Sequence, residues 1–287
     1  MNKSIVACAI DTTESAVVQL KKSSGTGHIL DACKIIPFGI EDFFSDKGNH
    51  RKKKLDTFIK GCRQEELALC YTPPMYLPLL ATFPVAATRE ECNNYCKIEA
   101  GYFLNQPEQY ECDSMEYGSR SDNDATDPRL LLFYPAEPCR ALSEYFSAHY
   151  RVLFHGTRQS TLLHLSKCSG MPQVILEFEN NYVLCAVARN GRMEHFSCHQ
   201  TNNTKESEYF ALSAIINNPV CRETEVQVTG SKADKAMIAF IKKETGLALK
   251  PIHSPHSLFI GNPHQYNLAS PATVKAISTA LMALGMQ

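Results

Sequence analysis

Residues 4–20 read SIVACAIDTTESAVVQL, and this stretch decides the fold because a second stretch repeats it. An apolar run ends at an acidic turn beginning at Asp11, a second apolar run follows, and a third ends near Pro37. Residues 173–188 read QVILEFENNYVLCAVA and repeat the order, with a third run that ends at Phe196. Short apolar runs separated by turn residues are typical of β-strands. Two equivalent three-stranded meanders predict two related subdomains that face one another across a cleft.

The composition favours a globular protein and argues against several classes of function. The 287 residues are 44% hydrophobic, which is enough for one or two cores. The formal net charge is only -1, so no overall field attracts nucleic acid. The basic run at 50–54 has no interleaved aromatic residues for base stacking, so we interpret it as a solvated helix face. No apolar stretch reaches the roughly 18 residues that span a bilayer. We therefore expect a cytoplasmic protein without a membrane span and without a nucleic-acid partner.

The cysteines are numerous but do not form a recognisable motif. Most of the 12 lie inside apolar runs, which predicts buried, reduced thiols rather than a disulfide framework. Cys92 and Cys96 are four residues apart on a predicted helix, while His195 and His199 flank Cys198 on a predicted strand. Neither pair has a second ligand pair at a recognisable spacing, so we predict no metal site.

The remainder of the first half alternates strands and helices, which favours an α/β domain. The predicted helices cover 55–70, 88–104, 137–149 and 161–165. Thr88 is the predicted N-cap of the second of these helices, with Glu91 as its capping-box partner. The predicted strands cover 75–83, 129–134 and 151–154. The polar stretch 113–127 is predicted to be a long exposed loop.

The second half repeats this organisation with fewer elements. Its predicted helices cover 206–217, 232–245 and 271–284, and its predicted strands cover 225–229 and 247–251. Val274, Ile277, Leu281 and Leu284 recur at helical spacing in the last helix, so we expect it to return and pack on the first half. The predicted domains are 1–168, with an inserted subdomain at about 72–127, then 169–268 and a C-terminal helix at 269–287.

This pattern of elements resembles the actin-like ATPase superfamily, which includes actin, chaperones and sugar kinases. The closer resemblance is to the PilM family of type IV pilus assembly proteins and its cell-division relative FtsA. The inserted region carries it best, through Phe83-Pro84, Thr88-Arg89-Glu90-Glu91, Lys97-Ile98-Glu99-Ala100 and Tyr102-Phe103-Leu104. The resemblance implies duplicated actin-like (ribonuclease H-like) α/β domains, each a mixed sheet with helices, plus a small inserted α+β subdomain.

The chain departs from the superfamily at the phosphate-binding turns. Members of the superfamily hold nucleotide phosphates with two Asp-x-Gly turns, because glycine lets backbone N–H groups close around phosphate. The corresponding turns here are Asp11-Thr12-Thr13 and Glu177-Phe178-Glu179, and neither contains glycine. The adenosine-side turn, Thr229-Gly230-Ser231, keeps one glycine. We therefore interpret the nucleotide site as degenerate and expect no cofactor.

Two functional hypotheses follow from this resemblance. The first is a non-catalytic cytoplasmic scaffold or adaptor, similar to PilM, that binds a protein or peptide partner, including one in a membrane-associated assembly. Its candidate contacts are Glu99, Tyr102 and Phe103 in the inserted subdomain. The alternative is a divergent ATPase or kinase in which Asp11 and the hydroxyls of Thr12 and Thr13 hold Mg²⁺ or phosphate, so ATP and Mg²⁺ are cofactors only in that case. The sequence leaves the oligomeric state open.

Overall fold

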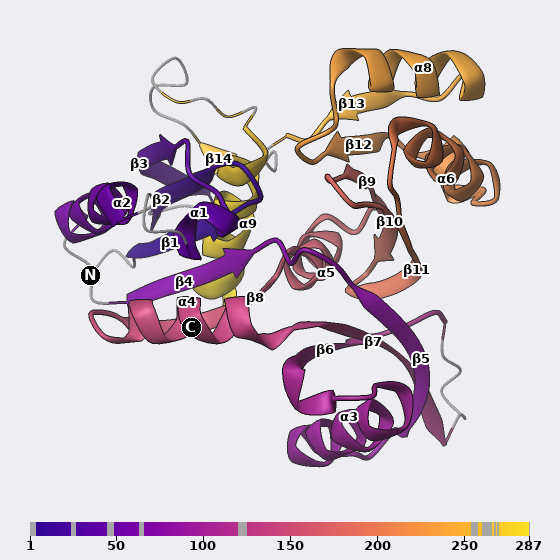
Figure 1. The fold of residues 1–287 in the computed structure, drawn as a ribbon, viewed down its shortest axis with the longest axis horizontal. Coiled ribbons are helices and arrows are strands. Elements are labelled where there is room, and N and C mark those ends of the chain that lie inside the picture. Colours follow the sequence, from indigo (N-terminus) through magenta and orange to yellow (C-terminus); the bar gives the residue numbers. More distant parts are fainter. Residues whose placement is uncertain are drawn as a thin grey trace. The chain divides into compact units, whose positions relative to one another are not determined.

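The computed structural model describes residues 4–23, 27–44, 49–62, 66–119, 125–253, 258–259, 266, 268 and 270–286. The chain divides into two compact units (Figure 1). The first unit comprises Met1–Thr72, Arg140–Thr161 and Pro251–Gln287, and the second comprises Pro73–Cys139 and Leu162–Lys250. The domain boundaries expected at 168 and 268 stay predictions.

The first unit is built on a six-stranded sheet with the order β14-β3-β2-β1-β4-β8. Its strands are β1 (Ser4–Ile10), β2 (Ser15–Lys22), β3 (His28–Ile36), β4 (Glu66–Tyr71), β8 (Arg151–Thr157) and β14 (Leu258–Phe259). The first three form the predicted antiparallel meander, and β4 continues the sheet parallel to β1. Residues 5–10 of β1 are all buried, so both faces of this strand are covered.

Helices cover the sheet of the first unit. Helix α9 (Pro271–Met286) packs against β1, β2 and β4, and α2 (Asn49–Gly61) lies along β2 and β3. The other helices that contribute residues to this unit are α1 (Ile40–Phe44), α4 (Ala136–Ser147) and α5 (Arg158–Ser169). Almost all of α9 is buried, including four polar side chains: Thr273, Lys275, Ser278 and Thr279. The expected apolar stripe therefore underestimates how deeply this helix is enclosed.

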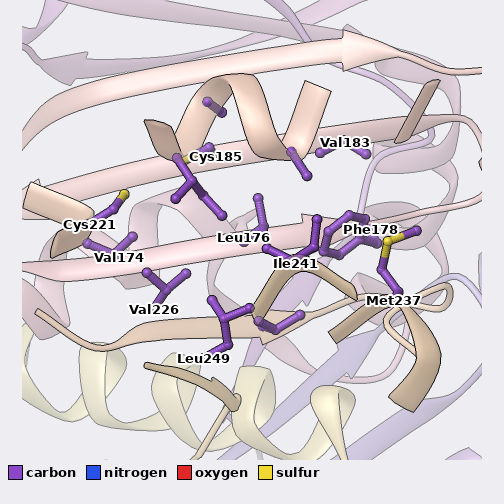
Figure 2. Packing of buried hydrophobic residues seen from close by; sticks show 14 of the residues in the cluster. Val174, Leu176, Phe178, Val183, Cys185, Cys221, Val226, Met237, Ile241 and Leu249 are labelled. Carbon is purple, nitrogen blue, oxygen red and sulfur yellow. The ribbon is translucent and has the colours of Figure 1, made fainter. Parts of the chain in front are cut away.

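The second unit contains a five-stranded sheet with the corresponding order β11-β10-β9-β12-β13. Its strands are β9 (Gln173–Phe178), β10 (Tyr182–Arg189), β11 (Arg192–Gln200), β12 (Val226–Thr229) and β13 (Leu249–Pro251). Helices α6 (Thr204–Ile216) and α8 (Lys235–Thr245) cover one face, and the short α7 (Val220–Glu223) follows α6. Figure 2 shows the resulting core, in which Val174, Leu176 and Phe178 of β9 pack with Met237 and Ile241 of α8.

The inserted subdomain is a three-stranded antiparallel sheet with one helix packed on it (Figure 1). Its elements are β5 (Leu77–Pro84), α3 (Arg89–Phe103), the 3-10 turn η2 (Pro107–Gln109), β6 (Tyr110–Glu116) and β7 (Thr126–Pro135). The predicted capping box of α3 is confirmed, since Thr88 and Glu91 exchange side-chain-to-backbone hydrogen bonds. The guanidinium of Arg192 ties this subdomain to β11, donating to Glu116 at 2.6 Å and to Asp127 at 2.8 Å.

Two predictions of secondary structure are wrong. The helix predicted over 55–70 ends with α2 at Gly61, and Glu66–Tyr71 form β4 instead. A central parallel strand is buried on both faces, so its continuous apolar run has no alternation to distinguish it from helix. The loop predicted at 113–127 contains the end of β6 and the start of β7, while residues 120–124 lie outside the described residues. Strand β6 is half-buried at a sheet edge, which explains its polar sequence.

The described part of the chain also bears on the membrane and cysteine predictions. None of its helices is long and apolar enough to cross a membrane. All cysteines whose side chains are described are free thiols, and among them Cys8, Cys70 and Cys185 are buried.

Candidate functional site

The two acidic turns occupy the same place in the two sheets. In the first unit the last paired residues of the β1–β2 hairpin are Ile10 and Ser15, and the Asp11 N–H donates to the Glu14 carbonyl at 2.9 Å. In the second unit the Glu179 N–H donates to the Tyr182 carbonyl at 2.9 Å, directly after the last pair of β9 and β10. Glu179 is thus the counterpart of Asp11.

The sequence analysis matches Asp11 with Glu177, and this alignment is therefore wrong by two residues. Glu177 lies inside β9, opposite Leu184 of β10 and Thr229 of β12. A shift of two residues keeps side chains on the same face of a strand, so the hydrophobic pattern cannot detect it.

Asp11 forms a buried ion pair with a lysine from the last helix. The Lys275 Nζ lies 2.8 Å from Asp11 Oδ2, and the two side chains are 1% and 5% exposed. Lys275 also donates to Thr72 Oγ1 at 2.8 Å, and the Thr12 N–H donates to Asp11 Oδ1 at 2.9 Å. Burial by itself would raise the pKa of Asp11, but the charge of Lys275 and these hydrogen bonds outweigh burial and lower it. The carboxylate is therefore ionised and already neutralised by a cation of the same chain.

The start of α9 is attached to the same turn by a second contact. The Ser270 hydroxyl donates to the Glu14 carboxylate and accepts the Thr273 N–H at 3.3 Å, which makes Ser270 the N-cap of α9. Lys275 lies one turn further along the helix. The position of its ammonium group is consequently fixed by the helix as well as by the ion pair.

The backbone after β3 covers the first turn from another direction. The Ile40 N–H donates to the Asp11 carbonyl at 2.8 Å, and a Cβ atom added at Gly39 would overlap the carbonyl oxygen of Thr12. Thr12 is half-buried here and Thr13 is exposed. The first turn is thus packed closely against the backbone of its own chain.

The second turn is satisfied by different groups. Glu177 and Glu179 are buried on the sheet face opposite α6 and α8, because the alternating residues of β9 point into the helix-covered core. Glu179 Oε2 accepts from the Ser231 hydroxyl at 2.7 Å and from the Ser231 N–H at 3.3 Å. Gly230 has φ +104°, and a Cβ atom there would overlap the Phe178 carbonyl oxygen. The retained glycine of this turn therefore permits close backbone packing within the protein.

A tyrosine hydroxyl adjoins the two buried glutamates. Tyr182 is fully buried, and its pKa is raised well above its usual value by burial and then by the charge of Glu177, with smaller effects of Tyr76 and Glu179. The phenol therefore stays neutral at physiological pH. Among the described residues no group of three His, Cys, Asp or Glu side chains is placed to hold a metal ion.

The predicted partner-binding residues lie on two sides of α3. Tyr102 is 88% exposed, whereas Glu99 is half-buried and the Phe103 ring packs 5.9 Å from that of Phe133. Ile98, one helical turn before Tyr102, is 53% exposed and shares its face.

The structure thus groups the predicted cleft residues by unit. Asp11, Thr12 and Thr13 lie in the first, and the second contains the group Glu177, Glu179, Gly230 and Ser231. Sequence reasoning missed Lys275 and Thr72. The available signal was a single lysine within the otherwise uncharged run 271–286.

Comparison with known proteins identifies the fold. No protein-family model and no curated protein sequence matches this chain. Among solved structures, a chain of the PilM–PilN type IV pilus biogenesis complex is similar over 98% of both chains, with a TM-score of 0.71 and 11% sequence identity. A Bacteroides thetaiotaomicron protein with an actin-like ATPase fold and unknown function matches 96% of this chain and 95% of its own, with a TM-score of 0.56 and 10% identity. The chain therefore has the actin-like fold that the sequence predicts.

Proposed function

We propose that this protein is a non-catalytic, cytoplasmic actin-like adaptor for a protein partner. In this proposal its nucleotide site is degenerate, because the Lys275 ammonium group binds the Asp11 carboxylate. The observation that carries the proposal is the buried Lys275–Asp11 ion pair. The partner-binding part is supported by the fold similarity to a chain of the PilM–PilN complex, in which two proteins assemble. Under this proposal the partner belongs to a membrane-associated assembly.

The first turn does not fit a magnesium nucleotide. Asp11 could bind Mg²⁺ only after losing Lys275, which would leave a buried ammonium without its counter-ion. Breaking one side of a buried ion pair costs about 3–5 kcal/mol. The backbone N–H of Thr12 donates to Asp11 itself, and Ile40 binds the Asp11 carbonyl, so these groups are already engaged within the protein.

The second turn is equally unsuited to polyphosphate. Glu177 and Glu179 are both buried, on the sheet face opposite α6 and α8. Each like-charge pair at about 4 Å costs about 1–4 kcal/mol at effective dielectric constants of about 80 to 20. Asn180 and Asn181 occupy the turn positions that follow Glu179, so no glycine is available there.

Calorimetry with Mg-ATP tests this proposal on the unmodified chain. We expect no heat of binding at micromolar protein and no phosphate release, and the Thr13→Gly variant should behave in the same way because Lys275 remains in place. Micromolar affinity for Mg-ATP that Asp11→Ala weakens would overturn the proposal and favour the divergent ATPase or kinase. A thermal shift gives a second readout, since a ligand at 100 times its Kd stabilises the folded state by about 2.7 kcal/mol.

A further inference from the structure

The inserted subdomain carries charge of opposite sign to the rest of the chain. Residues 72–127 contain ten acidic and three basic residues, a net charge of -7. The whole chain has 30 acidic and 29 basic residues, so the other residues have 20 acidic and 26 basic residues and a net charge of +6. A near-neutral protein with this separation presents a local negative field at the subdomain.

Helix α3 presents an exposed apolar stripe within this acidic subdomain. Tyr102 is 88% exposed and Ile98 is 53% exposed, four residues apart on one face. Cys96 and Ala100 of the same helix are buried against Phe83 and Leu131 of the sheet. The helix is therefore anchored on one side, and its other side carries apolar side chains that no described core includes.

Acidic residues border the stripe at both ends of the helix. Glu91 lies seven residues before Ile98 on the same face, and its pKa is lowered by hydrogen bonds from the Thr88 backbone and hydroxyl, so it is ionised. Glu90 is exposed beside it, and Glu108 is exposed in η2, which contacts the end of α3. The basic residues of the described range 72–119 are Arg89 and Lys97, both exposed.

We propose that the Ile98–Tyr102 face of α3 binds a basic amphipathic segment of a partner protein. Apolar side chains of that segment would cover Ile98 and Tyr102, and its lysines or arginines would lie opposite Glu91 and Glu108. Charge complementarity of this kind selects the sign of the partner and speeds association. An exposed tyrosine ring also offers a cation–π contact to arginine or lysine. The inference rests on the proposed adaptor function.

A pair of synthetic peptides measures this interaction on the full chain. The probe is a labelled amphipathic helix of leucine and lysine, and its partner has glutamate at every lysine position. We expect fluorescence anisotropy to detect binding of the lysine peptide only, with an affinity that falls at least about tenfold between about 0.05 and 0.5 M salt. Absence of binding, or equal binding of both peptides, overturns the proposal.

Matched variants localise the binding to α3. Ile98→Ala with Tyr102→Ala should weaken binding at least about tenfold, as expected for central contacts of an interface. Ile216→Ala with Tyr209→Ala is the control, because these side chains of α6 are 54% and 65% exposed. Equal losses in both double variants would show adsorption to any exposed apolar surface and would contradict the proposal.

Two other occupants of the face are outcomes that overturn it. If a second copy of the chain covers α3 through its basic residues 50–54, sedimentation will show a salt-sensitive oligomer that Tyr102→Ala dissociates. If a lipid surface covers it, the chain will bind anionic vesicles and Tyr102→Ala will release it. The nucleotide measurement does not involve α3, and the peptide measurement does not involve Asp11. The two measurements therefore distinguish failure of the docking proposal from failure of the proposal that the protein is an adaptor that does not bind nucleotide.

Discussion

The two acidic turns have the same position in their sheets and are stabilised in different ways. Asp11 and Glu179 both begin the turn of a hairpin, and each lies near a hydroxyl that follows the neighbouring parallel strand, Thr72 after β4 and Ser231 after β12. The first acid has in addition an ammonium group from α9. A buried carboxylate persists only when hydrogen bonds or an opposite charge compensate for its lost hydration. The duplicated fold thus buries a carboxylate at the same place in both sheets. One carboxylate is stabilised by an ammonium group and the other by a hydroxyl group.

The two turns differ in how far along the chain the group that binds each carboxylate lies. Lys275 is 264 residues from Asp11, whereas Ser231 is 52 residues from Glu179. The first turn is therefore satisfied only when α9 is docked, and docking of α9 is favoured because it satisfies the turn. The hydroxyl that binds Glu179 in the second turn comes from its own unit, just after β12.

The largest effect that separates the two turns is expected from Lys275→Met. It leaves the buried Asp11 carboxylate without its cation, so the free energy of unfolding in urea should fall by about 3–5 kcal/mol. Adding Asp11→Asn should recover much of this loss, because the pair is then replaced by neutral groups. Lys235→Met, at an exposed lysine of α8, is the control and should change stability by less than about 0.5 kcal/mol. A loss below about 1 kcal/mol for Lys275→Met would contradict the ion pair.

A smaller effect is expected at the glycines that pack on the turns. Gly230→Ala should destabilise by about 3 kcal/mol, because its Cβ atom would overlap the Phe178 carbonyl at a positive φ. Gly39→Ala should cost about 1–3 kcal/mol, because its Cβ atom would overlap the backbone of Thr12 and Thr13, although its φ is not positive. Gly246→Ala measures the cost of the backbone conformation without overlap, because its φ is +69° and nothing lies within 4 Å, so a loss of about 1–2 kcal/mol is expected. If Gly230→Ala costs no more than Gly246→Ala in urea unfolding, the second turn is not tightly packed.

Local patterns predicted much of this fold, and the missing parts have physical causes. The two meanders follow from short apolar runs and turn residues, and the cap at Thr88 follows from four adjacent positions. The actin-like fold follows from the resemblance of the repeated order of elements to that superfamily, and the solved structures confirm it. The sequence analysis did not predict strand β4, because a strand that is buried on both faces has no alternation of apolar and polar residues. The sequence analysis did not predict the role of Lys275, because no local sequence pattern links a lysine of the last helix to a turn near the N-terminus.

The hydroxyls beside the two acids should contribute less than the lysine. Ser231→Ala removes a 2.7 Å hydrogen bond to the Glu179 carboxylate, so a loss of about 1.5–3 kcal/mol is expected. Ser231→Thr keeps the hydroxyl and should retain most of that stability. Ser278→Ala is the matched control, because its hydroxyl donates to a neutral carbonyl of its own helix and should cost about 1 kcal/mol or less. Equal losses for Ser231→Ala and Ser278→Ala in the same denaturation series would show that the charge of Glu179 is unimportant.

The smallest effect concerns acid pH and applies to the first turn. The pKa of Asp11 is lowered in the folded protein, so the carboxylate binds a proton more readily after unfolding. Its contribution is therefore fully present above the ordinary aspartate pKa of about 3.9 and is lost as the pH falls through the lower folded value. The measurement is the urea midpoint from neutral pH to about pH 3, compared with that of Asp11→Asn with Lys275→Met. We expect the two midpoints to run parallel down to about pH 4 and the wild-type midpoint to fall more steeply below it. If the two urea midpoints stay parallel down to about pH 3, Asp11 has the same pKa in the folded and unfolded chain. The charge of Lys275 would then not stabilise the ionised carboxylate of the first turn.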